Sequence, residues 1–142
     1  IAEAVGRKLL KLSREIIVEN GGDIFLKSQR TRLIGIYSGK SAYSGRVALK
    51  VKPEETPLGI CTSSGTIGHS LSLGKADAAI VISPSAALAD AAATAIGNLV
   101  GDDADSIQRG IEFARGIEGL RGVAIIKGDK MALWGKITIV GR

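Results

Sequence analysis

A carboxylate and a hydroxyl four residues apart, Asp90 and Thr94, are the best-placed pair for chemistry in this sequence. On a helix, residues i and i+4 project from the same face, about one turn apart. Two oxygens placed in this way could bind a hard cation such as Mg²⁺, which prefers oxygen ligands and keeps waters or phosphate contacts. Alternatively, Thr94 bonds the Asp90 carbonyl, and Asp90 only caps or pairs locally. Spacing alone favours this local interpretation.

A Gly/Ser-rich loop supplies the second group of candidates. The segment Ser63-Ser64-Gly65-Thr66-Ile67-Gly68 could form an anion-binding nest of backbone N–H groups and hydroxyls, or it is an ordinary turn. The only histidine, His69, follows directly and is a candidate for proton transfer or phosphate contact, unless it is merely exposed. Cys61 precedes the loop. It could be a thiolate nucleophile paired with His69, or simply a small side chain at a strand end.

A second glycine-rich segment, Gly35 to Ser41, invites comparison with a phosphate-binding P-loop. The P-loop pattern needs four residues between its two glycines, and only three stand here. No helix is expected to follow, because Gly45 interrupts the segment. We therefore reject a P-loop at this position.

The positions of these residues depend on the elements around them. Hydrophobic periodicity predicts a helix over Ile1 to Val18, ended by Asn20-Gly21-Gly22. Strands are predicted by short apolar or alternating runs at Asp23–Leu26, Leu33–Tyr37, Val47–Val51, Gly59–Thr62 and Ala78–Ser83.

The second half contains two predicted helices. Ser85 is expected to cap an alanine-rich helix from about Ala86 to Leu99, and a helix over Ala104–Arg115 follows the cap candidates Asp102 and Asp103 and stops at Gly116. Three strands over Gly122–Val140 are predicted to end the chain, the first two joined by a Gly128-Asp129 turn. The pattern predicts one α+β unit, residues 1–142, with an antiparallel-leaning sheet.

Composition restricts the class of protein. The chain has 142 residues, 45% of them hydrophobic and 23% charged, as in one globular domain. No apolar run approaches the roughly 20 residues of a membrane span, so we expect no transmembrane helix. One cysteine excludes an internal disulfide and fits a reducing, cytoplasmic compartment. Because the first residue is Ile1 inside a helical pattern, we expect an N-terminal portion to be missing, and a signal peptide stays open.

Charge is distributed unevenly along the chain. The net charge is +5; residues 1–58 hold 11 Lys/Arg against 6 Asp/Glu, whereas residues 59–142 hold 8 of each. This bias could favour an anionic ligand. With only 4% aromatic residues there are few platforms on which nucleic-acid bases could stack, and no nucleic-acid motif is present. Nucleic acid is therefore not an expected partner.

Three motifs, in order, resemble the ApbE family of flavin transferases. The family has an Asn-x-Gly-Gly-Asp-Ile segment, a Thr-Ser-Gly loop, a strand, and a helix reading Ala-Asp-Ala-x-x-Thr-Ala. This chain has Val18-Glu19-Asn20-Gly21-Gly22-Asp23-Ile24, then Thr62-Ser63-Ser64-Gly65, then Ala78–Ser83 and Ala89–Ala95. The resemblance covers roughly residues 15–100.

The resemblance implies a fold, a cofactor and a set of site residues. The fold would be T-fold-like, a mixed sheet with antiparallel strands and packed helices. Asp90 and Thr94 would bind Mg²⁺ at the pyrophosphate of a flavin nucleotide, FAD or FMN, and His69 would be the catalytic candidate. The nucleotide would lie against two segments, Asn20-Gly21-Gly22-Asp23 and Thr62-Ser63-Ser64-Gly65. Enzymes of this family cleave FAD and pass FMN to a threonine of a partner protein.

The chain departs from the family pattern after the Thr-Ser-Gly loop. The family has His-Ile-Ile-Asp-Pro-x-Thr-Gly some distance on, whereas here the segment from His69 to Gly74 comes almost at once and lacks the Asp-Pro-x-Thr core. Two hypotheses therefore stand: an Mg²⁺-dependent protein that transfers FMN or cleaves the FAD pyrophosphate, and a non-catalytic module that kept the fold. The expected partners are a flavin nucleotide or another anionic small molecule, a protein acceptor and a second copy in a homodimer.

Overall fold

The computed structural model describes residues 1–65 and 73–142. The helices are α1 (Ala2–Leu9), α2 (Ala86–Leu99), α3 (Ser106–Arg115) and the 3₁₀ helix η1 (Pro53–Glu55). The strands are β1 (Ile16–Asn20), β2 (Asp23–Lys27), β3 (Arg32–Gly35), β4 (Val47–Val51), β5 (Leu58–Ser63), β6 (Ala78–Ser83), β7 (Gly122–Lys127), β8 (Lys130–Gly135) and β9 (Ile139–Gly141).

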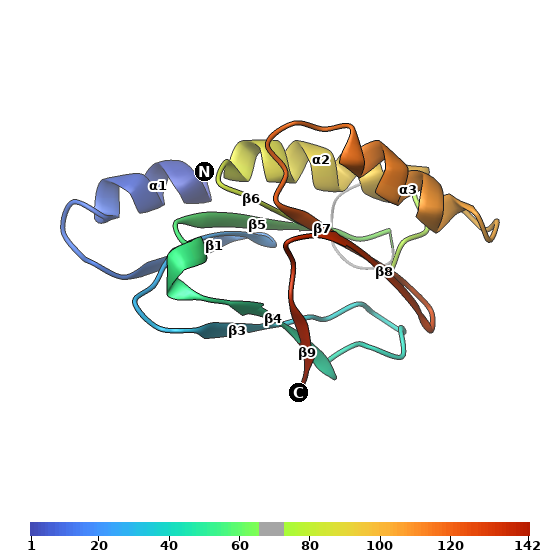
Figure 1. Cartoon of the computed structure of the whole chain (residues 1–142), viewed down its shortest axis with the longest axis horizontal. Coiled ribbons are helices and arrows are strands. Elements are labelled where there is room, and N and C mark those ends of the chain that lie inside the picture. Colours follow the sequence, from blue (N-terminus) through green and yellow to red (C-terminus); the bar gives the residue numbers. More distant parts are fainter. Residues whose placement is uncertain (66–72) are drawn as a thin grey trace.

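These elements form three layers (Figure 1). A six-stranded sheet in the order β1-β2-β5-β6-β7-β8 lies in the middle, with the α-helices on one face and the three-stranded sheet β3-β4-β9 on the other. Every strand pair in the described residues is antiparallel. The predicted α+β class with antiparallel strands is thus confirmed, but the strands form two sheets where we expected one.

The prediction of a single helix over residues 1–18 is wrong in its second half. The helix ends at Leu9, and Ile16–Asn20 is a strand paired with Asp23–Lys27. The β-branched run Ile16, Ile17, Val18 suits a pleated strand better than a helix. Gly21 and Gly22 do not terminate a helix but form the two-residue turn of this hairpin, with φ of +62° and +96°, which glycine adopts at low cost.

The remaining elements follow the sequence closely. The predicted bounds of α2, β4 and β6 match those observed, and the Ser85 side chain accepts a hydrogen bond from the Leu88 N–H at 3.2 Å, as an N-cap does. α3 begins two residues later than predicted, after Asp105. Asp103 is not its cap, because its carboxylate pairs with Arg109 at 2.7 Å.

Alternation along the strands decides which side chains meet the helices. Successive residues of a strand point to opposite faces of the sheet. Cys61 of β5 belongs to the hydrophobic cluster under α2 and α3, whereas its neighbour Ile60 belongs to the cluster between the two sheets. In β2, Phe25 contacts the position of Gly6 in α1. Asp23, two residues before Phe25, therefore also faces the helix layer.

Close approach of α2 to the sheet depends on one glycine. A Cβ added to Gly59 of β5 would lie 2.5 Å from the Ala86 Cα, inside backbone that cannot yield. The small side chains of this alanine-rich helix allow the close approach. Buried among them are Ala86, Ala89, Ala93 and Gly97. Within residues 1–65 and 73–142, no helix combines the length and hydropathy that a bilayer crossing requires.

Candidate functional site

Two carboxylates from separate motifs, Asp23 and Asp90, line one cavity of about 380 Å³. The cavity lies between α1, the first residue of β2 and the first turns of α2. The described residues that line it are Ile1, Ala2, Glu3, Ala4, Arg7, Asp23, Ala86, Ala87 and Asp90. We call it the acidic cavity.

Each carboxylate is delivered by a rigid element. Asp23 begins β2 directly after the hairpin turn and stands opposite Cys61 in the ladder between β2 and β5. Asp90 lies in the second turn of α2, on the exposed side of a helix whose other side is packed on β5 and β6. The tight contact at Gly59 and Ala86 fixes the distance of that helix from the sheet.

The electrostatics of the acidic cavity favour a cation. Partial burial raises the pKa of Asp23 and the negative charge of Asp90 raises it further, whereas the neighbouring Cys61 side chain and the positive amino group of Ile1 lower it. Asp90 itself forms no hydrogen bond or ion pair with the part of the chain that the structure describes. Neither Asp23 nor Asp90 forms an ion pair among the described residues. Two neighbouring carboxylates disfavour their shared ionised form, and a bound cation would compensate it.

Sequence reasoning missed two residues of this cavity, Glu3 and Arg7. The Glu3 carboxylate accepts a hydrogen bond from the Ala86 N–H at 2.8 Å, at the N-terminus of α2, and pairs with Arg7 at 2.7 Å. Desolvation works against the ionised form of Glu3, but the hydrogen bonds from Arg7 and Ala86 hold its pKa below the usual value. The i,i+4 spacing of Glu3 and Arg7 was a signal for their pairing. Nothing in the sequence indicated the contact with Ala86.

Cys61 has no role as a nucleophile in this geometry. Its side chain is 1% exposed, and its thiol donates to the Ala86 carbonyl at 3.3 Å. Burial, followed by the negative charge of Asp23, raises the pKa of the thiol far above its ordinary value. A thiol that stays protonated is a poor nucleophile, so the interpretation of Cys61 as a small buried side chain is the one that the structure supports.

Thr94 lies one turn beyond Asp90 on the same exposed side of α2 but does not line the acidic cavity. Among the described residues, no hydrogen bond ties the Thr94 hydroxyl to the Asp90 carbonyl, so the local interpretation of this pair has no contact to support it. The exposed side continues one more turn to Asn98, whose side-chain oxygen accepts from the Leu73 N–H at 3.2 Å.

The Thr62-Ser63-Ser64-Gly65 segment is divided between the two faces of the large sheet. Thr62 falls on the same face as Ile60, away from the helices, and it is exposed. Ser63 falls on the helix face, where its side chain lies beside Gly97 of α2. Ser64 is half-buried, and the Gly65 N–H donates to the Ala76 carbonyl at 2.9 Å, which takes this amide out of any anion nest.

Glycines hold the two ends of the following loop together. A Cβ at Gly65 would lie 2.0 Å from the Gly74 carbonyl oxygen, and a Cβ at Gly74 would lie 1.8 Å from that of Gly97. Gly65 and Gly74 therefore lie close together, and Gly74 lies against the C-terminal turn of α2. His69 and the predicted nest residues Thr66 to Gly68 lie outside the described residues.

The hairpin turn brings the other predicted segment to the edge of this region. Asn20 ends β1 opposite Asp23, and Gly21 is exposed. A Cβ at Gly22 would lie 3.6 Å from the Thr62 carbonyl oxygen, so the two predicted cofactor-binding segments do lie side by side. Of the two segments, however, only Asp23 lines the acidic cavity.

The donor set of the acidic cavity suits a magnesium ion better than a softer metal. Besides Glu3, which is engaged by Arg7 and the Ala86 N–H, its carboxylates are Asp23 and Asp90. These two offer oxygen ligands only, and Mg²⁺ in nucleotide sites commonly takes one or two carboxylates and fills its other positions with water and phosphate. No group of three or more His, Cys, Asp or Glu side chains capable of holding a metal occurs in residues 1–65 and 73–142. A cage made entirely of such protein ligands is therefore absent from that part of the chain.

Fold and site together define an α+β protein with a helix layer on an antiparallel sheet and a cavity lined by Asp23 and Asp90 where the two meet. A family model described as "AbpE bacteria" matches residues 1–116, and the chain therefore belongs to that family.

The chain is also similar to archaeal proteins named UPF0280. One from Methanococcus maripaludis strain C7 is 47% identical over 127 residues, which cover 87% of this chain and 51% of the relative. A relative from Methanocella arvoryzae is 45% identical over 126 residues, covering 89% and 51%. One from Methanocaldococcus jannaschii is 41% identical over 143 residues, covering 96% and 59%. The chain thus spans about half the length of the first two relatives.

Proposed function

We propose that this chain is part of an ApbE-like, T-fold-like protein that binds a flavin nucleotide, FAD or FMN, with Mg²⁺ in the acidic cavity. The observation that carries the proposal is the meeting of Asp23 and Asp90. They belong to two separate motifs and lie 67 positions apart in the chain, and both line one cavity.

The residues of the cavity suggest a division of roles. Asp23 and Asp90 would hold the cation. Thr94, one turn along α2, would extend the polar surface towards the pyrophosphate. Arg7 lines the cavity as well, and its guanidinium could contact a phosphate oxygen while it stays paired with Glu3. When bound, Mg²⁺ would neutralise phosphate charge and stabilise a leaving group.

Under this proposal the reaction is cleavage of the FAD pyrophosphate or transfer of FMN to a protein acceptor. A non-catalytic module that binds the nucleotide is the alternative. The Gly65 amide favours this alternative, because it is engaged by Ala76 and therefore offers no N–H to a phosphate. The segment after His69, which lacks the Asp-Pro-x-Thr core, favours it as well.

Calorimetric titration with FAD, with and without Mg²⁺, tests the binding site. We expect Mg²⁺-dependent binding that weakens at least about tenfold in Asp23→Asn and in Asp90→Asn, since each variant removes one charged ligand. Asp129→Asn, at an exposed turn far along the chain, is the matched control and should bind as the parent does. Circular dichroism of each variant confirms that the fold is intact.

Two results would overturn the proposal: binding that does not depend on Mg²⁺, or binding that both cavity variants leave unchanged. Incubation with FAD and Mg²⁺ then separates enzyme from module. Release of FMN and AMP supports the enzyme, whereas tight binding without turnover supports the module.

A further inference from the structure

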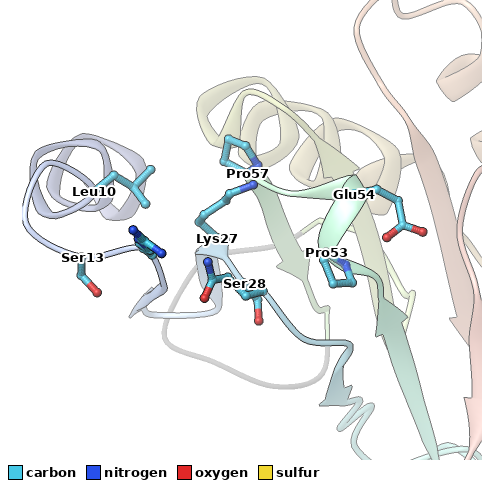
Figure 2. Close-up of a pocket in the computed structure, with 9 residues that line it drawn as sticks. Leu10, Ser13, Lys27, Ser28, Pro53, Glu54 and Pro57 are labelled. Carbon is cyan, nitrogen blue, oxygen red and sulfur yellow. The ribbon is translucent and has the colours of Figure 1, made fainter.

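A second cavity, of about 590 Å³, lies at the C-terminal end of α1 (Figure 2). Three segments form it: the turn after α1, the end of β2, and η1 with the residue that begins the approach to β5. The described residues that line it are Leu10, Ser13, Arg14, Lys27, Ser28, Gln29, Pro53, Glu54 and Pro57. We call it the basic pocket, and its volume is typical of small-molecule sites.

Two cations line the basic pocket without acidic partners. In the described part of the chain, neither Arg14 nor Lys27 forms an ion pair with a carboxylate. Lys27 is half-buried, and its Nζ donates to the Thr56 carbonyl at 3.0 Å. A lysine ammonium has three N–H donors, so this contact orients the group while leaving donors for a ligand.

The nearby carboxylates do not neutralise these cations. Glu15, the neighbour of Arg14 in the chain, pairs with Arg32 at 3.4 Å and with Arg30 at 3.7 Å. It also accepts from the Gln29 N–H at 2.7 Å, and this hydrogen bond is the main reason that its pKa is lowered. Glu54 borders the pocket but is exposed, and Figure 2 shows its carboxyl group directed away from Lys27.

Hydrogen bonds between the three segments hold the wall of the pocket in place. The Ser28 N–H donates to the Thr56 hydroxyl at 3.3 Å, and this hydroxyl donates to the Pro53 carbonyl at 2.7 Å. The buried Ser28 hydroxyl accepts from Arg32 Nε at 2.9 Å. A wall fixed before a ligand arrives reduces the ordering cost of binding.

We propose that the basic pocket binds a small organic anion. Its phosphate or carboxylate head lies between Arg14 and Lys27, where both can donate charge-assisted hydrogen bonds, and its apolar body packs on Leu10, Pro53 and Pro57. The excess of positive charge in residues 1–58 supports this choice of ligand, because every residue of the pocket comes from that part of the chain. The inference does not depend on the function proposed for the acidic cavity.

Titration of the ¹⁵N-labelled protein, followed by amide chemical shifts, tests this inference with three probes of similar size: phenyl phosphate, benzoate and benzyl alcohol. Saturable shifts centred on the amides of Ser13, Ser28 and Gln29 are expected for one or both anions, and not for the alcohol. A preference for phenyl phosphate identifies phosphate esters as the ligand class, and a preference for benzoate identifies carboxylic acids.

Variants locate the binding groups. Lys27→Met and Arg14→Gln should each raise the dissociation constant about tenfold. Lys8→Gln removes an exposed charge of α1 that does not line the pocket, and it should leave the constant unchanged. The inference is overturned if no probe gives saturable shifts at these amides, if the alcohol binds as well as the anions, or if Lys8→Gln weakens binding as much as Lys27→Met.

Discussion

The acidic cavity and the basic pocket share α1 as a wall and differ in charge. The start of the helix, with Glu3 and Arg7, borders the cavity that contains Asp23 and Asp90. The residues at and after its end, Leu10, Ser13 and Arg14, border the pocket that contains Lys27. The same short segment thus faces a site suited to a cation at one end and a site suited to an anion at the other.

The difference between the two sites comes from pairing and not from composition. Each has charges of both signs nearby, but Glu3 is satisfied by Arg7, and Glu15 is satisfied by Arg30 and Arg32. Within the described residues, Asp23 and Asp90 in one site and Arg14 and Lys27 in the other form no ion pair. Surface ion pairs contribute little to stability; here their larger effect is to decide which charges are left for a ligand.

The largest effect on one site alone is expected from a variant that moves α2 away from the sheet. Gly59→Ala places a Cβ 2.5 Å from the Ala86 Cα, and we expect a loss of about 2–3 kcal/mol in the free energy of unfolding. Urea denaturation measures it. Gly141→Ala is the matched control, because nothing lies within 4 Å of its added Cβ. Equal losses in the two variants would show that α2 does not pack as closely as described.

The same variant separates the two sites. Because Ala86 and Ala87 line the acidic cavity only, Gly59→Ala should alter Mg²⁺-dependent binding there and leave anion binding in the basic pocket unchanged.

The buried thiol beside the acidic cavity gives the next largest effect. Cys61 should react with iodoacetamide at least about a hundredfold more slowly in the native protein than in urea, because the thiolate is disfavoured and the sulfur is covered. The alkylation rate measures this directly. Rapid native alkylation would restore Cys61 as a candidate nucleophile.

Glu3→Gln tests the link between α1 and α2. It removes the charge from the contact with the Ala86 N–H, and we expect the free energy of unfolding at pH 7 to fall by about 0.5–1 kcal/mol. The pKa of Glu3 is lowered in the folded state, so its stabilisation is present above the ordinary unfolded pKa and is lost as pH falls through the folded value. The difference between parent and variant should therefore shrink below about pH 4.

Asp23→Asn should have the smallest effect, and of opposite sign. The raised pKa of Asp23 means that its ionised form costs stability in the absence of a cation. Asparagine removes that cost, so the free energy of unfolding at pH 7 should rise by about 0.5 kcal/mol, a figure reduced for solvent screening. The gain should disappear as pH falls below about 4, where the parent carboxyl is protonated. A less stable variant at pH 7 would mean that Asp23 is structural.

The sequence predicted local elements well wherever short-range signals agree. For α2, the Ser85 cap, the alanine-rich run and the preceding apolar strand all indicate the same bounds, and the structure has them. The prediction failed at residues 10–18, where helical periodicity and β-branched residues conflict. The conflict is resolved by pairing with β2, a contact that periodicity within one segment does not reveal.

The candidate site was predictable only as separate parts. The sequence identified Asp23 in one motif and Asp90 in another, but placed Asp90 with Thr94 because helical spacing is all that a single segment defines. In the structure Asp90 shares a cavity with Asp23, while Thr94 lies outside its lining. Glu3 and Arg7 entered the site through the packing of α1 beside α2.

By itself, the sequence determined the α+β class, the bounds of its most regular elements, the excess of positive charge in the first 58 residues, and the carboxylates available for a cation. Each of these depends on residue type or on neighbours a few positions away. Only the tertiary structure decided that β2 and α2 bring Asp23 and Asp90 to one cavity, that Cys61 is buried, and that Arg14 and Lys27 keep their charges unpaired. Burial and pairing arise from contacts between distant segments, and these exist only when the chain is folded.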